Sequence, residues 1–391
     1  MAEKLNGKLS VKLKRNLRRS IQRGHPWIYR EALDSLPAVQ RAQLCRISDN
    51  KGELAWAIYD PHGPLSLRVL SLDKIPPTKG ILLGRLDRAL KLRDGIRSEM
   101  TTGYRLINGE GDLFPGLICD VYDSIAVVQF DGQGPSEFWD RTIITDWLMN
   151  LKWCQSVVEK SRRSSEQEFK LLAGAAAPAE VEILENGARY RVNIEMGQKT
   201  GFFLDQRDNR QFVRQISHGK DVLNLFSYTG GFSVAAGLGG ATRVTSVDVA
   251  RGAIDLANIN WQLNHLEAKS HQSLCVDVFA FLKEPGDLWS HVVVDPPSMG
   301  HSEEQRANAV AKYVDLFALA ARRVTKGGHF SVSSCSSHVS FTDFFEIITE
   351  ALSLARRRGQ ILRVSGQPAD HPFPHACHEL RYLKFVHLVL D

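Results

Sequence analysis

The sequence predicts an α/β protein whose C-terminal half is a doubly wound, Rossmann-like sheet preceded by two smaller domains. Three observations support this prediction. The chain has 391 residues, more than one ordinary domain holds. From about residue 180, short apolar runs alternate with helical patterns, the order typical of a parallel sheet. Each apolar run ends at a polar residue, and such sheets bind their ligands beyond the carboxyl ends of the strands.

The N-terminal region, residues 1–72, is predicted to be a small β-rich domain. It contains short β-like runs, of which 53–59 is the clearest, and that run is ended by Asp60-Pro61. Its charge is unusual, because residues 1–30 hold nine Lys and Arg against the single acid Glu3, while the whole chain has a net charge of only +5. A basic cluster on a near-neutral body indicates a polyanionic partner, most simply nucleic acid. A solvated basic arm and a targeting peptide are the alternatives.

Residues 73–178 are predicted to form a central α+β domain. The region begins at the turn Pro76-Pro77, continues into a helix over 81–92, and then shows strand-like runs such as 124–130. The stretch 172–179 is small and alanine-rich, as expected of a linker or loop. The third domain is therefore predicted to span 179–391.

The third domain shows the strand and helix alternation most clearly. A helix is predicted over 250–264, because Ala250, Ala253, Ile254 and Ala257 recur on one face. The apolar runs predicted to be strands are 222–226, 243–247, 273–276, 291–294, 329–334 and 382–390. The residues that directly follow the middle four of these runs are Asp248, Asp277, Asp295 and Cys335.

Composition narrows the class of protein further. No run of about 18 apolar residues occurs, which argues against a membrane span, and the first residues lack the apolar core of a secretion signal. The six cysteines are scattered without a CxxC pair, which is typical of reduced thiols. We therefore expect a cytoplasmic protein. His371, His375, Cys377 and His378 fit no regular zinc spacing, so no metal is predicted.

The turn after the first strand of the third domain indicates a nucleoside cofactor. The turn reads Ser227-Tyr-Thr-Gly-Gly231, and Asp248 follows Gly230 by 18 residues at the end of the next strand. A carboxylate there can accept both ribose hydroxyls of a dinucleotide or of S-adenosylmethionine. The full GxGxxG fingerprint is missing, which favours the cofactor without phosphates. An ordinary turn followed by a helix-capping Asp is the structural alternative, and the same holds for Asp277, whose carboxylate could reach an adenine amino group.

Candidate catalytic residues follow two further predicted strands. In Asp295-Pro296-Pro297, the prolines fix a rigid, extended lip without amide protons, which suits a flat base held by a carboxylate. Cys335 lies just past another strand, and a thiol there is either a nucleophile or a small buried residue. Placed opposite the Asp-Pro-Pro loop, the nucleophile is the favoured interpretation.

These motifs together resemble the RlmI-like family of large-subunit ribosomal RNA cytosine-carbon-5 methyltransferases. The run 197–210, GQKTGFFLDQRDNR, is similar to the family signature, as is 224–232, NLFSYTGGF. Asp248, Asp277, Asp295-Pro-Pro297 and Ser334-Cys-Ser336 fall where the family has its cofactor and catalytic motifs. Gly24-His-Pro-Trp27 resembles the motif of its PUA-like RNA-binding domain, and 108–118 resembles the start of its central domain.

The resemblance implies a class I methyltransferase fold over 179–391 that uses S-adenosylmethionine and acts on RNA of the large ribosomal subunit to form 5-methylcytosine. Its catalytic residues are then Cys335, as nucleophile, and Asp295. The residues implied to bind the cofactor are Phe203, Gln206, Arg210, Phe226, Ser227, Tyr228, Thr229, Gly230, Asp248, Val249, Asp277, Val278 and Asp295.

Other functions stay open at this point. A methyltransferase of the same fold could act on a base nitrogen, with Cys335 inert. A non-catalytic RNA-binding or ribosome assembly protein could keep the fold. A nicotinamide oxidoreductase is disfavoured because the pyrophosphate glycines are absent. A homodimer is also left open, and no membrane partner is expected.

Overall fold

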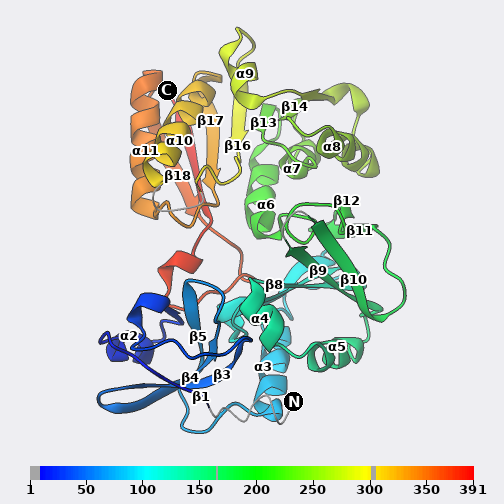
Figure 1. Ribbon diagram of the computed structural model, residues 1–391. Coiled ribbons are helices and arrows are strands. Elements are labelled where there is room, and N and C mark those ends of the chain that lie inside the picture. The colour runs from blue at the N-terminus through cyan, green and yellow to red at the C-terminus, as the bar shows by residue number, and fades with distance from the viewer. Residues whose placement is uncertain (1–8, 164–165, 301–304) are drawn as a thin grey trace. The chain divides into compact units, whose positions relative to one another are not determined.

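The computed structural model describes residues 9–163, 166–300 and 305–391, and the chain divides into two compact units (Figure 1). The first unit holds residues 1–183, 192–204 and 369–378, and the second holds 184–191, 205–368 and 379–391. Lys4, Lys8 and Glu3 of the basic cluster lie outside the described residues. Among the described residues, no helix combines the length and the apolar character needed to cross a membrane.

A five-stranded sheet opens the first unit. Its spatial order is β1-β3-β4-β5-β2, and only the β1–β3 pair is parallel. Val11, Ile47, Ala57 and Leu67 are buried beneath it, so the predicted β-rich character of this region is confirmed. The elements are β1 (Leu9–Lys12), α2 (Arg18–Gln22), β2 (Trp27–Tyr29), β3 (Gln43–Asp49), β4 (Gly52–Tyr59) and β5 (Leu65–Ser71).

A second five-stranded sheet, of order β10-β9-β8-β7-β6, follows in the same unit. In strand β10, Leu171 and Ala173 pair with Val158 and Val157 of β9. Strand β10 therefore continues to Gly174 and includes the first residues of the predicted linker 172–179. The elements are α3 (Lys79–Lys91), β6 (Gly103–Asn108), β7 (Leu117–Tyr122), β8 (Ile125–Phe130), α4 (Gln133–Phe138), α5 (Arg141–Met149), β9 (Ser156–Arg163) and β10 (Glu166–Gly174).

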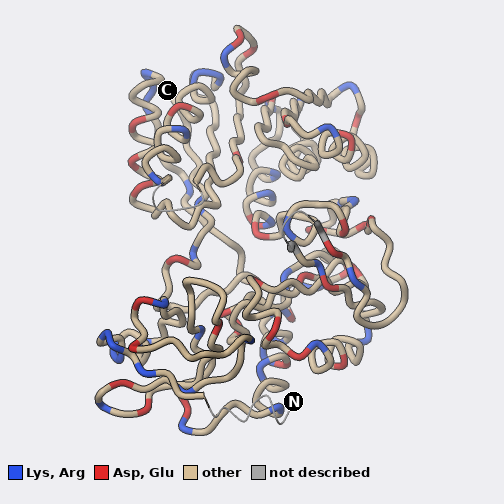
Figure 2. The backbone as a smooth tube through the Cα atoms, in the orientation of Figure 1, with Lys and Arg blue, Asp and Glu red and all other residues tan. Residues whose placement is uncertain are grey.

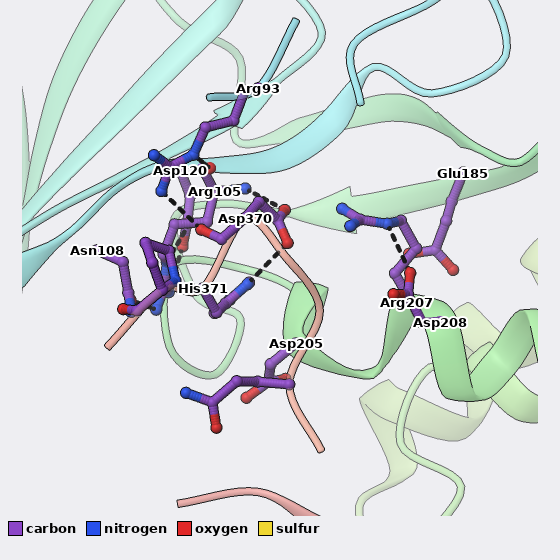
Figure 3. Close-up of polar contacts among 12 residues, drawn as sticks. Arg93, Arg105, Asn108, Asp120, Glu185, Asp205, Arg207, Asp208, Asp370 and His371 are labelled. Atoms are coloured by element: carbon purple, nitrogen blue, oxygen red, sulfur yellow. Dashed lines mark hydrogen bonds and ion pairs between the residues drawn. The ribbon is translucent and has the colours of Figure 1, made fainter. Parts of the chain in front are cut away.

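Buried ion pairs bind the late segment 369–378 into the first unit (Figure 3). Arg93 makes a two-pronged pair with Asp112 at 2.7 Å per bond and donates to the Asp370 carbonyl at 2.8 Å. The backbone N–H of Arg105 donates to Asp370 Oδ2 at 3.0 Å, and Asp370 Oδ1 bonds the ring of His371. These charges are buried, so each depends on its partner for solvation. The structure thus gives His371 a hydrogen-bonding role inside this unit.

The second unit is built on a seven-stranded sheet of order β15-β14-β13-β16-β17-β19-β18, in which β19 alone runs antiparallel to its neighbours. The predicted doubly wound sheet is confirmed. The strands are β13 (Asp221–Leu225), β14 (Arg243–Asp248), β15 (His271–Cys275), β16 (Trp289–Val294), β17 (Val324–Ser334), β18 (Gly359–Ser365) and β19 (Lys384–Leu390).

Helices cover both faces of this sheet (Figure 1). One face packs against Val213, Phe232 and Trp261 of α6, α7 and α8, and the other against α9, α10 and α11. The hairpin of β11 (Glu180–Glu185) and β12 (Ala188–Asn193) contains the boundary between the two units. The helices are α6 (Arg207–Ile216), α7 (Gly231–Leu238), α8 (Arg251–Leu263), α9 (Val278–Lys283), α10 (Arg306–Ala321) and α11 (Phe341–Ala355).

Neutral histidines buried in the second sheet predict a loss of stability in mild acid. His291 and His387 both bond Ser331 Oγ, at 2.9 and 2.8 Å, and burial lowers the pKa of His387 to about 3 and that of His291 well below its usual value. Because their folded-state pKa values lie below the unfolded value near 6.5, their full contribution is present above pH 6.5 and is lost as the pH falls. Between pH 7.5 and 5.5 we expect the free energy of unfolding to drop by about 2–3 kcal/mol from this pair.

Denaturant titrations across that pH range measure this drop. The variant His387→Gln keeps hydrogen-bonding capacity towards Ser331 and removes one titrating ring, so its pH dependence should be shallower than that of the wild type. Equal slopes in the two proteins would show that His387 does not contribute.

Candidate active site

The loop after β13 is held in an unusual backbone conformation. Phe226, Tyr228 and Gly230 all have positive φ, at 58°, 46° and 78°, and such conformations are costly for residues other than glycine. At Gly230 a β-carbon would lie 2.9 Å from the β-carbon of Ala257, so glycine is also required for α7 to pack on α8. Surrounding structure must stabilise this loop, and conformations of this kind cluster at ligand-binding sites.

Asp248, at the end of β14, supplies part of that support. Its Oδ2 accepts the backbone N–H of Tyr228 at 2.8 Å, and its Oδ1 accepts that of Ala250 at 2.9 Å. Each carboxylate oxygen has a further lone pair, so the half-buried group can still accept ligand hydroxyls. The hydroxyls of Ser227 and Thr229 are buried beside it and bond no other described atom. Buried polar groups normally have partners, so these two hydroxyls are suited to a polar ligand.

Asp295 directly follows β16 and is held by two neutral donors. Its Oδ1 accepts the side-chain amide of Gln206 at 2.9 Å and the hydroxyl of Ser333. Gln206 is itself fixed, because its Oε1 accepts from Asn209 at 2.6 Å, and Asn209 accepts from Ser365 at 2.8 Å. Gln206 and Asn209 are almost fully buried, so the orientation of the Asp295 carboxylate is set by the protein before any ligand binds.

Cys335 follows β17, the neighbour of β16. The two strands are parallel with Val294 opposite Val332, so Asp295 and Cys335 emerge from adjacent strands at the same edge of the sheet. Cys335 is half-buried, and the residue before it, Ser334, donates to the hydroxyl of Tyr313 at 3.1 Å. The arrangement brings a carboxylate and a thiol to the ends of adjacent strands, and β16 is also the neighbour of β13, which leads into the loop that carries Phe226–Gly230.

Known proteins resemble this chain over nearly their whole length. The chain is 35% identical over 390 residues to the ribosomal RNA large subunit methyltransferase I of Photobacterium profundum, an alignment that covers 96% of this chain and 98% of the relative. It is 34% identical to a ribosomal RNA large subunit methyltransferase of Deinococcus radiodurans, over 95% of each chain. The chain belongs to the ribosomal RNA large subunit methyltransferase family.

Domain and structure comparisons agree with membership of this methyltransferase family. A model described as an S-adenosylmethionine-dependent methyltransferase matches residues 141–314, and a PUA-like domain matches 11–72. A structure from Streptococcus mutans described as an S-adenosylmethionine-dependent methyltransferase is 25% identical, with a TM-score of 0.87 over 97% of this chain and all of that chain. A second methyltransferase, solved as a complex with SAH, has a TM-score of 0.85 over 97% of this chain and 99% of that one. S-adenosylmethionine is therefore the methyl donor, and the buried hydroxyls of Ser227 and Thr229 and the carboxylate of Asp248 suit it.

The remaining residues predicted to bind the cofactor of this methyltransferase occupy different environments. Asp277 caps α9, since its Oδ1 accepts the N–H of Ala280 at 2.8 Å, and its side chain is exposed, as is that of Val249. Val278 is buried in the core, so only its backbone is available to a ligand. The cofactor contacts of all three stay predictions.

The signature run 197–210 is divided between the two units at Leu204. Phe203 falls in the first unit, where the Lys199 ammonium lies 4.6 Å from its ring centre. In the second unit Arg210 is fully buried in a two-pronged pair with Glu185, at 2.6 and 2.5 Å. The pair with Glu185 gives Arg210 a structural role, and Gln206 donates a hydrogen bond to Asp295. Whether the three residues contact the cofactor stays a prediction.

Sequence reasoning missed two residues beside Cys335. Tyr313 comes from α10, and burial raises its pKa to about 12. Lys384 comes from β19, where it pairs with Ser334, and its Nζ donates to the carbonyls of Ser336 and Tyr382 at 2.6 and 2.7 Å. Only the order of strands in the sheet brings Lys384 here, and the one signal in the sequence is a lysine at the start of a mostly apolar strand.

Removing the Asp248 carboxylate should weaken cofactor binding. Charge-assisted hydrogen bonds are worth about 1.5–3 kcal/mol each, so we expect Asp248→Ala to bind S-adenosylmethionine at least about tenfold more weakly. Calorimetry measures this affinity. Asp221, at the opposite end of β13, is a matched control, and Asp221→Ala should keep the affinity of the wild type. Equal affinities for the two variants would remove Asp248 from the site.

Proposed function

We propose that this methyltransferase acts on large-subunit ribosomal RNA and forms 5-methylcytosine through a covalent adduct with Cys335. The names of its relatives support the substrate, and the PUA-like match over 11–72 supports binding to RNA. The observation that favours the carbon-5 reaction is the placement of Asp295 and Cys335 on adjacent strand ends. A carboxylate that holds a base edge beside a half-buried thiol is what addition to a pyrimidine ring requires.

Cytosine carbon 5 is a poor nucleophile, and the thiol of Cys335 overcomes this. The thiolate adds to carbon 6, forming an S–C6 bond, and the electrons of the C5=C6 double bond move into an enamine that makes carbon 5 nucleophilic. When bound, S-adenosylmethionine would supply an electrophilic methyl group to carbon 5, and its sulfur would keep the electron pair of the broken S–CH3 bond, leaving S-adenosylhomocysteine. Loss of the carbon-5 proton to a base returns its electron pair to C5=C6, and Cys335 departs as thiolate.

Asp295 has two tasks in this proposal. Because Gln206 and Ser333 fix its Oδ1, the carboxylate presents a constant direction to the edge of the base. The fixed carboxyl group can accept the exocyclic amino N–H of the base and, in its protonated form, give its proton to ring nitrogen 3, which neutralises the negative charge that thiolate addition develops on the ring. The base must be unpaired or flipped out, since its ring faces are otherwise stacked.

Identification of the product nucleoside tests this proposal. Large-subunit RNA from a strain that lacks the gene is incubated with the protein and S-adenosylmethionine, digested, and analysed by mass spectrometry. We expect 5-methylcytidine. A nucleoside methylated on nitrogen would contradict the carbon-5 reaction and favour the nitrogen methyltransferase, and no methylation of any RNA would favour a binding or assembly protein.

The basic residues near the N-terminus predict a salt-dependent contact with RNA. Lys and Arg gather around α2 (Figure 2), and a pocket of ≈ 640 Å³ there is lined by Arg19, Ser20, Arg23, His25, His375 and Ala376, with no acidic residue among them. Arg18 is the exception, because it makes a two-pronged pair with Asp49 at 2.8 and 2.5 Å.

Replacing Lys12, Lys14, Arg19 and Arg23 by Ala should flatten the dependence of RNA affinity on salt, by about 0.7–0.9 in log–log slope for each lost phosphate contact. Fluorescence anisotropy at several salt concentrations measures it, and cofactor affinity should not change. Arg18→Ala serves as the control, since its charge is already paired with Asp49. Equal slopes for wild type and the fourfold variant would mean that these side chains are solvated only.

A further inference from the structure

Lys384 is a buried cation that the proposed reaction has not yet used. It is 1% exposed, and burial lowers its pKa to about 8. Burial of an ammonium is costly unless carbonyls or a negative charge compensate it. The two carbonyls at 2.6 and 2.7 Å supply part of that compensation. The free-energy cost of burying this ammonium, so near the turn of Cys335, requires an explanation.

The position of Lys384 is set by strand pairing. In the antiparallel β17–β19 pair, Lys384 lies opposite Ser334, the residue before Cys335. Its Nζ donates to the carbonyl of Ser336, the residue after Cys335. The ammonium therefore spans the turn that carries the thiol, and Asp343 and an ionised Cys335 are near enough to raise the pKa of Lys384, against the larger lowering by burial. Asp343 is already paired with Arg306 at 2.6 Å and caps α11.

A second hydrogen bond connects Lys384, through Tyr382, to the segment that holds Asp295. Lys384 also donates to the carbonyl of Tyr382, whose hydroxyl donates to Asp205 at 2.6 Å. Asp205 precedes Gln206, which holds Asp295. The turn of Cys335 and the carboxylate of Asp295 are thus fastened to neighbouring residues of one short segment.

We propose that Lys384 is a positioning residue for Cys335, whose ammonium fixes the Ser334–Ser336 turn and stabilises the thiolate that adds to the base. This inference rests on the proposed function. The thiol proton passes to solvent before addition, and the cation favours the anion that remains, since a thiolate is favoured beside a positive charge. Tyr313 and Asp295 also lie near the thiol, but neither carries a positive charge.

The pH dependence of Cys335 alkylation by iodoacetamide tests this role. Cys275 is the other half-buried cysteine, so all proteins carry Cys275→Ser, and the modified peptide is counted by mass spectrometry. We expect the midpoint of the rate profile to move up by about one pH unit in Lys384→Met and Lys384→Gln and to return towards the wild type in Lys384→Arg. The turnover number should fall in the neutral variants more than the KM for either substrate changes.

Lys160 provides a matched control. It is also 1% exposed, and it donates to the carbonyl of Gly197 at 2.6 Å in the first unit. Lys160→Met removes a buried ammonium in the same way but should leave the alkylation profile of Cys335 unmoved. An unmoved profile in a folded neutral variant of Lys384 overturns the proposal.

A reciprocal measurement covers the case in which the neutral variants do not fold. If the ammonium stabilises the thiolate, the thiolate stabilises the ammonium equally, so Lys384 should lose its proton at a lower pH in Cys335→Ser than in the wild type. NMR of 13C-labelled lysine side chains follows this titration. Identical titration of Lys384 in the two proteins would overturn the role of Lys384 without affecting the proposed reaction. Methylation by Cys335→Ala would instead overturn the proposed reaction without affecting the alkylation result.

Discussion

RNA that carries 5-fluorocytosine at the target position is expected to become covalently attached to this protein when S-adenosylmethionine is present. Release of the normal product requires loss of the carbon-5 proton, and fluorine cannot leave as a cation. The bond between Cys335 and carbon 6 should therefore persist and survive denaturing gel electrophoresis. In Cys335→Ala the adduct should disappear, and methylation of normal RNA should fall by at least about a thousandfold, because the addition step is lost.

Cys335→Ala should still bind the cofactor, since the groups predicted to hold the cofactor lie on the loop after β13 and at the end of β14. Cys275, at the end of β15, is the matched control, and Cys275→Ala should form the adduct as the wild type does. If Cys335→Ala methylates RNA at a substantial rate, the carbon-5 assignment is wrong, while the assignment as a methyltransferase stands.

The second large effect is expected from Asp295→Asn. Asparagine keeps an Oδ1 that can accept from Gln206 and Ser333, so the side chain stays in place and only the second oxygen and the negative charge are replaced. Loss of a pre-organised group that stabilises the transition state costs roughly 100- to 1,000-fold in turnover. We expect a drop of this size in single-turnover assays, with the affinity for S-adenosylmethionine nearly unchanged.

Two neighbouring variants separate chemistry from positioning at Asp295. Ser333→Ala and Gln206→Met each remove one donor to Oδ1 and leave the carboxylate present, so each should cost less than Asp295→Asn. If Asp295→Asn instead weakens cofactor binding as strongly as it lowers turnover, the carboxylate acts on the cofactor and not on the base. Unchanged turnover would exclude Asp295 from both tasks.

The sequence allowed the strand ends of the second unit to be predicted because local signals suffice there. An apolar run followed by Asp248, Asp295 or Cys335 places each side chain at the same edge of a parallel sheet, and the structure has them there. The neighbours that orient these groups were not predictable in this way. Lys384 reaches Cys335 only because β19 inserts antiparallel next to β17, and nothing local to residues 382–390 specifies that position.

The signature run shows a different limit. Gln206 and Arg210 were implied as site residues by the resemblance of this run to the family signature, but the motif does not reveal which atoms they bond. In the structure, Gln206 holds Asp295 and Arg210 pairs with Glu185, both over separations of 25 residues or more. The linker predicted over 172–179 was partly wrong because strand pairing outweighed the weak local preference of Leu172, Ala173 and Gly174. Likewise, no local feature of residues 369–378 indicates that they belong with the first unit.

The inclusion of residues 369–378 in the first unit has a consequence for how the protein is made. Arg93 and the carbonyl of Asp370 are separated by 277 residues, which a ribosome adds in roughly 14–55 s. During that period Arg93 and Arg105 lack their hydrogen-bond partner Asp370. The first unit therefore cannot be completed while the second unit is still being synthesised. The two units should therefore mature together at the end of translation, and a nascent chain arrested before residue 369 should expose its first 180 residues to proteases and chaperones longer than an independent N-terminal domain would.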